Sequence, residues 1–253
     1  MRLADFISVC QAALWAETPA AAKALAYLRG RGIRDDTIRH LQLGWCQEGT
    51  ELPDGEDPED HIWLYHRRVT VPVFSEFGEP VAIASRSPEA ESSGWLNSSS
   101  NIGFEKSRHL YLLCEAKRAV FVANKAYVFE GYIDGIIARQ EGLPNAVLPM
   151  GTALGLRQMG LLRRYGSELC LCFDTDTNQA GQVAQARAML EAHRAAFTKL
   201  SSITLPTGVD PDVFIRGYGG IPVLLQLERP VGPTELRHCE RVVDAQRQKG
   251  RAA

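Results

Sequence analysis

The chain has 253 residues, of which 45% are hydrophobic and 23% charged, and these fractions are typical of a globular protein and exclude a chain that is disordered throughout. Its formal net charge of −2 excludes a uniformly basic nucleic-acid-binding protein, so any contact with nucleic acid must use local patches. No apolar run approaches the roughly 18–20 residues of a membrane-spanning helix, and Asp5 interrupts the apolar N-terminal stretch, so neither a membrane span nor a secretory signal is predicted and a cytoplasmic location follows.

The N-terminal part of the chain shows helical patterns. Thr18 and Pro19 are typical of a helix start, with the threonine as cap and the proline in first position, and an alanine-rich run follows to a glycine stop at Gly30 or Gly32. Asp35 is placed to cap a second, short helix. The acidic segment 48–60 is rich in turn-forming residues, so we interpret it as a solvated surface loop.

A β-rich section follows this loop. Residues 69–74 and 80–86 have the composition of strands and flank a short turn-forming segment, which predicts a β-hairpin. Residues 110–113 predict another short strand. We expect the helices and this section to form a mixed α+β N-terminal subdomain over residues 1–120.

From residue 127 the pattern changes to strands that alternate with helices. The strand-like runs are YVFE, AVLPM, ELCLCFD and SSITLP, and a helical pattern follows each of them. Alternation of this kind produces a parallel sheet with helices on its faces. The predicted fold class is therefore α/β, with a Rossmann-like parallel-sheet subdomain over residues 121–220 and a short basic tail over 221–253 that we expect to be helical.

Acidic side chains gather where three of these strands end. They are Glu130 and Asp134 after the first strand, Asp174 and Asp176 after the third, and Asp210 and Asp212 after the fourth. The carboxyl ends of parallel strands meet at one edge of a sheet, where ligands bind. Converging carboxylates repel one another unless a cation lies between them, and hard oxygen ligands suit Mg²⁺ or Mn²⁺. Two such ions roughly 3.5–4 Å apart would clamp the attacking and leaving oxygens of a phosphoryl transfer.

Each of these carboxylates also has a structural interpretation. Glu130 suits the start of the next helix, and Asp176 is placed to cap the helix that follows it. Asp210 forms a turn with Pro211, and Asp212 suits a helix N-terminus. The coincidence of three acidic sites at three strand ends favours the functional interpretation.

The spacing of these residues also resembles a known domain. The segment EGYID at 130–134, followed by DTD at 174–176, resembles the Toprim domain in the form found in bacterial DnaG-type primases. Two further segments, MGTAL at 150–154 and LPTGVDPDVFIRGYG, resemble other parts of the primase Toprim domain. Three segments of the N-terminal half also resemble the primase core, namely AYLRGRGIRDDTIRHLQLGW, HRRVTVPVFSEFGEPVAIASR and WLNSSSNIGFEKSRHLYLL, so the likeness runs from about Tyr27 to Gly219.

The resemblance implies a role for each matching position. The catalytic residues and main metal ligands would be Glu130, Asp174 and Asp176, with Asp134, Asp210 and Asp212 as further ligands. A basic groove for template and nucleotide would be lined by Arg68, Arg86, Asn97 and Lys106. Guanidinium groups bind phosphate bidentately, which suits the two arginines independently of the resemblance.

The implied activity is template-directed synthesis of short RNA primers on single-stranded DNA by two-metal nucleotidyl transfer, with Mg²⁺ or Mn²⁺ and ribonucleoside triphosphates. The six cysteines include no C-x-x-C pair, so the zinc-binding domain usual in primases is not predicted. The residues after 220 are too few for a helicase-binding domain. We therefore expect a cytoplasmic, nucleoid-associated enzyme that works with a replicative helicase or a separate zinc-binding subunit and does not contact membranes.

Two other functions fit the acidic residues. A Toprim nuclease would use the same metal site to cut a phosphodiester bond, although the matching N-terminal half favours a primase. A non-catalytic single-strand-binding or replication accessory subunit would keep the acidic residues without the reaction. A topoisomerase is excluded, because the chain has no room for a tyrosine cleavage domain.

Overall fold

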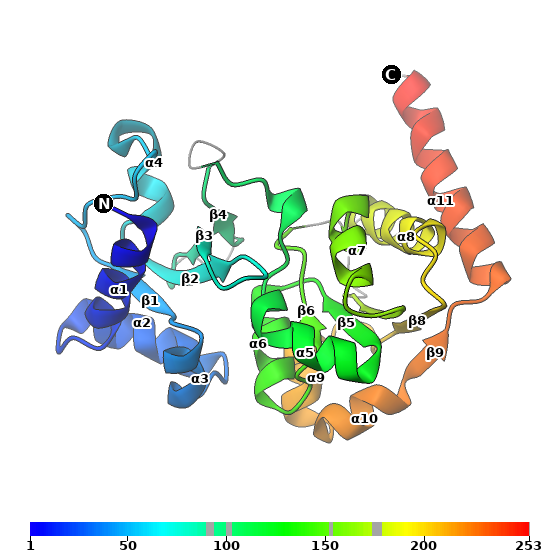
Figure 1. Cartoon of the computed structure of the whole chain (residues 1–253), viewed down its shortest axis with the longest axis horizontal. Coiled ribbons are helices and arrows are strands. Elements are labelled where there is room, and N and C mark those ends of the chain that lie inside the picture. The colour runs from blue at the N-terminus through cyan, green and yellow to red at the C-terminus, as the bar shows by residue number, and fades with distance from the viewer. Residues whose placement is uncertain (90–93, 100–102, 152–153, 174–178, 253) are drawn as a thin grey trace. The chain divides into compact units, whose positions relative to one another are not determined.

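The structure of the chain is a computed structural model that describes residues 1–89, 94–99, 103–151, 154–173 and 179–252 (Figure 1). The chain divides into two compact units, Met1–Glu105 and Lys106–Ala253. The boundary predicted at residue 120 falls inside helix α5 (Leu113–Ala123), whose apolar side chains belong to the core of the second unit. The second unit therefore begins before that helix.

The first unit combines helices with an antiparallel sheet. Its described helices are α1 (Leu3–Leu14), α2 (Pro19–Gly30), α3 (Asp35–His40) and α4 (Pro58–Tyr65). Its described strands pair in the order β1 (Gly44–Cys46), β2 (Arg68–Phe74), β3 (Pro80–Arg86) and β4 (Leu96–Asn97), each antiparallel to the next. The predicted hairpin is confirmed as β2 and β3, and Thr18 caps α2 as predicted, because its hydroxyl accepts the N–H of Ala21 at 3.1 Å.

Close packing of α1 on the sheet forms the core of this unit. Phe6 of α1 packs against Cys46 and Tyr65, and the rings of Phe6 and Tyr65 meet edge to face with 5.5 Å between their centroids. A side chain at Gly44 would come within 2.7 Å of the backbone of Cys10. Glycine is therefore required at the point where α1 approaches β1.

The acidic segment 48–60 is largely the exposed loop that its composition predicts, but it also contains the start of α4 and one buried carboxylate. Asp57 caps the N-terminus of α4, and the neighbouring Glu56 is only 7% exposed. The Glu56 carboxylate accepts hydrogen bonds from the Tyr65 hydroxyl at 2.6 Å and from the Ser99 hydroxyl at 2.8 Å. The prediction was wrong for Glu56 because its burial depends on side-chain contacts with Tyr65 and with the distant Ser99, which composition does not reveal.

The second unit is built on a mostly parallel sheet. Its described strands lie in the order β6 (Ala146–Val147), β5 (Lys125–Phe129), β7 (Glu168–Cys172), β8 (Lys199–Ile203) and β9 (Glu228–Pro230). The first four are parallel, as predicted, and β9 is antiparallel to β8. This architecture confirms the predicted α/β fold class.

Helices and one short 3₁₀ turn connect and flank these strands. They are η2 (Lys106–Arg108), α5, α6 (Tyr132–Gln140), α7 (Leu156–Arg163), α8 (Gln179–Arg194), α9 (Pro211–Gly217), α10 (Gly220–Gln226) and α11 (Pro233–Ala252). In the part of the chain that the structure describes, no helix is both long and apolar enough to cross a membrane.

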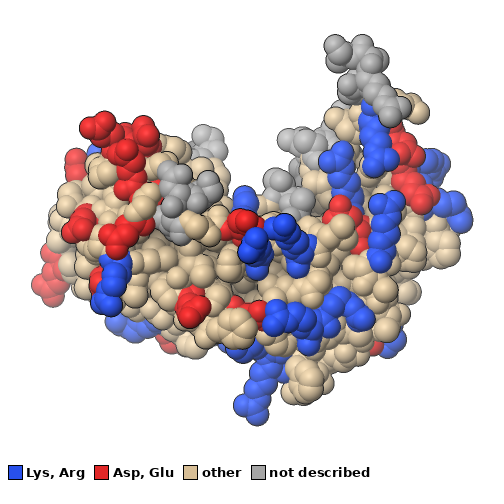
Figure 2. All heavy atoms as spheres, turned by 45° about the horizontal axis from the view of Figure 1, so that its top comes forward, with Lys and Arg blue, Asp and Glu red and all other residues tan. Residues whose placement is uncertain are grey.

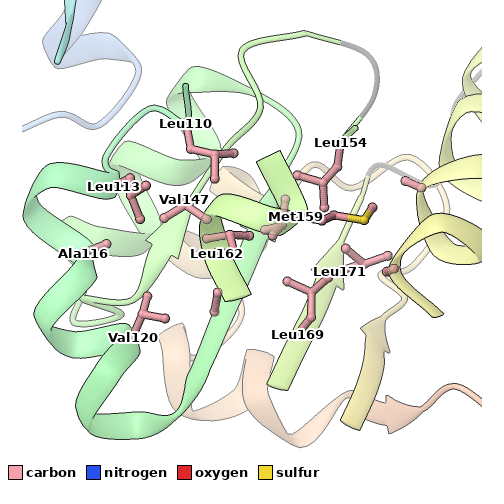
Figure 3. Packing of buried hydrophobic residues seen from close by; sticks show 14 residues of the cluster. Leu110, Leu113, Ala116, Val120, Val147, Leu154, Met159, Leu162, Leu169 and Leu171 are labelled. Carbon is pink, nitrogen blue, oxygen red and sulfur yellow. The ribbon is translucent and has the colours of Figure 1, made fainter. Parts of the chain in front are cut away.

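Figure 3 shows the main core of the second unit, where α5 and α7 pack on the sheet. Leu113 and Val120 of α5 and Leu162 of α7 belong to one apolar cluster with Val147 of β6 and Leu171 of β7. Full burial of a leucine or valine side chain contributes about 1.5–3 kcal/mol. This layer therefore holds the strands, and with them the strand ends, in fixed positions.

The predicted tail contributes to this unit. Strand β9 extends the sheet, and α11 packs against α8 through a small apolar cluster. Glu228 of β9 pairs with the ammonium group of Lys125 and accepts a hydrogen bond from the Tyr127 hydroxyl at 3.1 Å. Burial raises the pKa of the Glu228 carboxyl, but the hydrogen bonds from Lys125 and Ser201 outweigh burial and hold the pKa below its ordinary value.

Candidate active site

Strands β5 and β7 form the edge of the sheet where the predicted carboxylates converge. The two strands are parallel and paired, with Phe129 opposite Cys172, so both end at the same level. Glu130 follows directly after β5 and therefore lies at this carboxyl edge. Asp174 and Asp176, which follow β7 in the chain, lie outside the described residues, and their role as ligands stays a prediction.

Two of the predicted carboxylates join helix α6 to helix α9. Asp134, in the first turn of α6, is 7% exposed, and its Oδ1 accepts the backbone N–H of Asp212 at 3.0 Å. This bond satisfies one of the N–H groups at the start of α9 that have no partner within the helix. A side chain at Gly131 would overlap Oδ2 of Asp134, so the glycine of the EGYID segment is what allows the carboxylate to lie there.

Asp212 is buried still more deeply than Asp134. It is 1% exposed, and its Oδ2 forms an ion pair with Nη2 of Arg216 at 3.2 Å, one turn further along α9. The sequence analysis did not single out Arg216. The i, i+4 spacing of an acidic and a basic residue on a helix is the signal that indicates such a pair.

The remaining carboxylates are more accessible. Asp210 directly precedes α9 and is exposed, and its side chain makes no capping bond to the helix. Glu130 is half-buried, and its Oε2 accepts a hydrogen bond of 3.4 Å from Nε2 of Gln185 on α8. Within the described ranges, no group of three or more His, Cys, Asp or Glu side chains is placed to hold a metal ion. The predicted metal site therefore depends on Asp174 and Asp176.

A second group of predicted residues lies at one end of the sheet of the first unit. Arg68 is the first residue of β2, and Arg86, the last residue of β3, pairs with the next residue of β2, Val69. Asn97 is the last residue of β4 and pairs with Ala84 of β3. The pairing of these three neighbouring strands therefore brings the three predicted residues close together at one end of the sheet.

Each of the two arginines in this group has a buried N–H group with no acceptor among the described residues. Arg68 is 9% exposed, and its Nε donates to the Ser85 hydroxyl at 3.1 Å. Nη2 of Arg68 and Nε of Arg86 are buried and have no hydrogen-bond partner among the described residues. Burial lowers the pKa of Arg68, and the positive charge of Arg86 lowers it further. Two neighbouring cations with unused donors are suited to an anion such as phosphate, which would satisfy both.

Lys106, the last of the predicted contact residues, belongs to the second unit. It is the first residue of η2 and is exposed. Its side chain runs along the backbone of Gly151, since a side chain added at Gly151 would come within 2.8 Å of Nζ of Lys106. The structure therefore brings Lys106 next to the MGTAL segment, two parts of the chain that the sequence analysis treated separately.

Charge is unevenly distributed over the surface, as Figure 2 shows. Acidic side chains gather around α4 in the first unit, where Glu59 and Asp60 are exposed. Lys and Arg side chains are prominent on the second unit, where Arg157, Arg163 and Arg164 of helix α7 and its end are exposed. The small net charge therefore results from separate acidic and basic patches, as the sequence analysis required for contact with nucleic acid.

The chain is similar in sequence to known proteins. Residues 127–215 match the family model described as Toprim-like. The DNA primase of Neisseria meningitidis serogroup A is 28% identical over 251 residues, which cover 90% of this chain and 42% of the relative. The DNA primase of Synechococcus elongatus is 31% identical over 226 residues, which cover 79% of this chain and 33% of the relative. The chain thus spans less than half the length of these relatives.

Solved structures share its fold. A structure of the DnaG catalytic core matches with a TM-score of 0.75 and 26% identity, covering 90% of this chain and 79% of that chain. A DnaG primase catalytic domain bound to ssDNA matches with a TM-score of 0.74 and 26% identity, covering 90% and 78%. The RNA polymerase domain of Mycobacterium tuberculosis primase DnaG has the same fold, with a TM-score of 0.76 at 23% identity and 96% and 91% of the chains covered.

Proposed function

We infer that this chain, a homologue of DnaG-type DNA primases over about 90% of its length, is a primase catalytic core, and we propose that it synthesises short RNA primers on single-stranded DNA. The observation that carries the proposal is the extent of the similarity, which includes the antiparallel first unit as well as the Toprim unit. The match over 127–215 alone would fit a Toprim nuclease equally well.

Phosphate groups of the template and the nucleotide are the anions that we propose for the basic residues. The buried donors of Arg68 and Arg86 have no partner among the described residues, and Asn97 lies on the neighbouring strand. Single-stranded DNA carries one phosphate per nucleotide, so a strand passing this end of the sheet would supply the missing acceptors. Lys106 would bind phosphate as a point charge.

We propose that Mg²⁺ or Mn²⁺ is held at the carboxyl edge of the Toprim sheet by Glu130, Asp174 and Asp176. The paired ends of β5 and β7 support this, because Glu130 follows one strand and the two aspartates follow the other. Carboxylate oxygens are the ligands that these ions prefer. When bound, the ions neutralise and orient the triphosphate of the incoming ribonucleotide.

The proposed reaction joins the 3′-hydroxyl of one ribonucleotide to the α-phosphate of the next. A bond forms between the hydroxyl oxygen and the α-phosphorus, the bond from that phosphorus to the oxygen bridging to the β-phosphate breaks, and pyrophosphate leaves. The hydroxyl proton passes to Glu130 or to water. The contact between Asp134 and Asp212 fixes the N-terminus of α9 and so holds the exposed Asp210 in place as a further ligand.

The proposal extends to partners and location. Because the relatives are DNA primases, we propose that the chain acts at sites of DNA replication, with a cytoplasmic and nucleoid-associated location. A replicative helicase or a separate zinc-binding subunit would bring it to its template. Ribonucleoside triphosphates are its proposed substrates.

A primer-synthesis assay tests the proposal. Purified protein is incubated with single-stranded DNA, labelled ribonucleotides and Mg²⁺ or Mn²⁺, beside the Asp174→Asn/Asp176→Asn variant. Short RNA products that disappear in the variant would support a primase. Template cleavage without nucleotides would indicate a nuclease, and binding of single-stranded DNA without either reaction would indicate an accessory subunit.

A further inference from the structure

The side chain of Gln158 joins three segments of the second unit. It lies on α7 and is 2% exposed. Its Nε2 donates to the backbone carbonyls of Lys106 at 3.1 Å, His109 at 2.8 Å and Pro149 at 3.2 Å. Its Oε1 accepts the N–H of Gly155 at 3.1 Å. A buried amide that is satisfied on both sides fixes its partners, because losing it leaves several buried polar groups unpaired.

The segment that Gln158 holds has an unusual backbone. Met150 is buried and has a φ of 62°, in the left-handed region that non-glycine residues rarely adopt. Such a conformation costs about 1–3 kcal/mol and persists only when the surroundings determine it. The bond from Gln158 to Pro149, directly before Met150, is one of the contacts that do so.

The next residue, Gly151, sets the path of the Lys106 side chain. An added Cβ at Gly151 would lie 2.8 Å from Nζ, 3.5 Å from Cε and 3.6 Å from Cδ of Lys106. The outer half of the Lys106 side chain, from Cδ to Nζ, therefore lies in close contact with Gly151. Any other residue at 151 would displace the ammonium group, since the end of a lysine side chain is flexible and the backbone is not.

We propose that Gln158 and Gly151 are positioning residues for Lys106 and that the phosphate bound by Lys106 belongs to the nucleotide triphosphate, an inference that rests on the proposed function. Gln158 fixes the backbone of Lys106 relative to the strained segment at Met150, and Gly151 leaves room for the lysine to cross that segment. Together they determine where the ammonium charge lies.

A purely structural role is the competing explanation. The bond from Gly155 to Gln158 also caps α7, so loss of Gln158 affects the stability of this helix. A structural role predicts lower stability without a specific loss of nucleotide binding. A structural role also predicts that a substitution of Gln158 or Gly151 has the same effect in the wild-type chain and in the Lys106→Ala chain.

The test uses two variants, each with a matched control. Gly151→Ala moves only the end of Lys106, and Gly160→Ala is its control, because Gly160 is on α7 with nothing within 4 Å of an added Cβ. Gln158→Glu keeps the acceptor for Gly155 and removes the donors, and Gln248→Glu on the exposed side of α11 is its control. If Gln158→Glu does not fold, the uncharged Gln158→Met replaces it.

We would measure two quantities for each variant: the affinity for ATP with Mg²⁺ by calorimetry, and KM and kcat in primer synthesis. Each variant is made both in the wild-type chain and in the Lys106→Ala chain. We expect Gly151→Ala and Gln158→Glu each to weaken ATP binding and raise KM by about tenfold, the loss of one charge-assisted contact, with a smaller change in kcat. In the Lys106→Ala background neither variant should weaken binding further.

The possible results separate the two proposals. Effects that persist undiminished in the Lys106→Ala background, or variants that bind ATP like their controls, would overturn the positioning role while primer synthesis by the wild type still supports the primase. A wild-type chain that makes no primers but binds ATP with an affinity that depends on Lys106, and on Gly151 and Gln158 only while Lys106 is present, would overturn the primase and keep the positioning role. A wild-type chain that does not bind ATP overturns the positioning role.

Discussion

The buried charged groups among the predicted site residues have opposite signs in the two units, with carboxylates in the second unit and arginine donors in the first. In the second unit, Asp212 pairs with Arg216, and Asp134 accepts a backbone N–H from α9. In the first unit, Arg68 and Arg86 have buried donors that no described residue uses. A buried carboxylate that bonds to a neighbouring helix ties that helix in place, whereas a buried donor atom without an acceptor lowers stability until a ligand supplies one. We propose on this basis that α6 and α9 form a scaffold and that the two arginines bind phosphate.

Glu130 differs from the buried carboxylates of α6 and α9, because we propose that it takes part in the reaction and does not stabilise the fold. Glu130→Gln should reduce primer synthesis by at least about a hundredfold, since it removes a carboxylate that we propose holds the divalent ion at the reacting phosphates. The melting temperature should change little, because Glu130 is only half-buried. Glu141→Gln, at the exposed end of α6, is the control for both measurements. A Glu130→Gln enzyme with full activity would place Glu130 outside the reaction.

Asp212 should behave as a scaffold residue. Asp212→Ala removes the buried half of the ion pair with Arg216 and should lower the free energy of unfolding by about 1–3 kcal/mol in urea denaturation, a range that allows for the partial exposure of Arg216. Asp244→Ala is the control, because Asp244 forms an exposed ion pair with Arg247 on α11. Equal stability of the two variants would show that Asp212 does not organise α9.

Arg68 should behave in the opposite way. Arg68→Met removes a buried cation with an unused donor, so the free energy of unfolding should stay the same or rise. Affinity for single-stranded DNA should fall about tenfold, and the slope of log affinity against log salt should decrease by about 0.7, the loss of one phosphate contact. Arg241→Met on the exposed face of α11 is the control. Lower stability with unchanged DNA binding would reverse the assignment of the two regions.

Glu228, which lies away from the candidate active site, tests on a smaller scale whether a paired, partly buried carboxylate stabilises the fold. Its pKa is lowered in the folded state, so its contribution to stability is present above the ordinary glutamate pKa of about 4.3 and is lost as the pH falls through the folded pKa. Glu228→Gln should therefore be less stable than wild type at pH 7, by less than about 1 kcal/mol, and should approach it at acid pH. Thermal unfolding from pH 7 to pH 3 measures this, with Glu168→Gln, another ion-paired position, as control. A constant difference across that range would contradict the sign of the shift.

The parts of the fold that the sequence predicted depend on local pattern. The hairpin at β2 and β3 and the parallel strands have regular apolar spacing and turn residues between them, and Glu130 directly follows the parallel strand β5. The position of Glu130 follows from this pattern together with the resemblance to the Toprim domain. Chain direction in a parallel sheet is enough to place it, without any side-chain contact.

The rest could not be predicted because it depends on contacts between distant segments. The bond between Asp134 and Asp212, the bond from Ser99 to Glu56 and the bonds from Gln158 to Lys106 and His109 each join residues far apart in the chain. Strand β9 is too short for a periodic pattern and is stabilised by pairing with β8 and by the contacts of Glu228. Composition and periodicity carry no information about such pairings.

A primase copies its template, so the sequence of the RNA product decides whether this chain is one. Purified protein is given single-stranded DNA of known sequence with ribonucleotides and Mg²⁺ or Mn²⁺, and any RNA product is sequenced. The account predicts short RNA that is complementary to the template and absent with Glu130→Gln. RNA unrelated to the template, or a shortened template with no RNA, would contradict it.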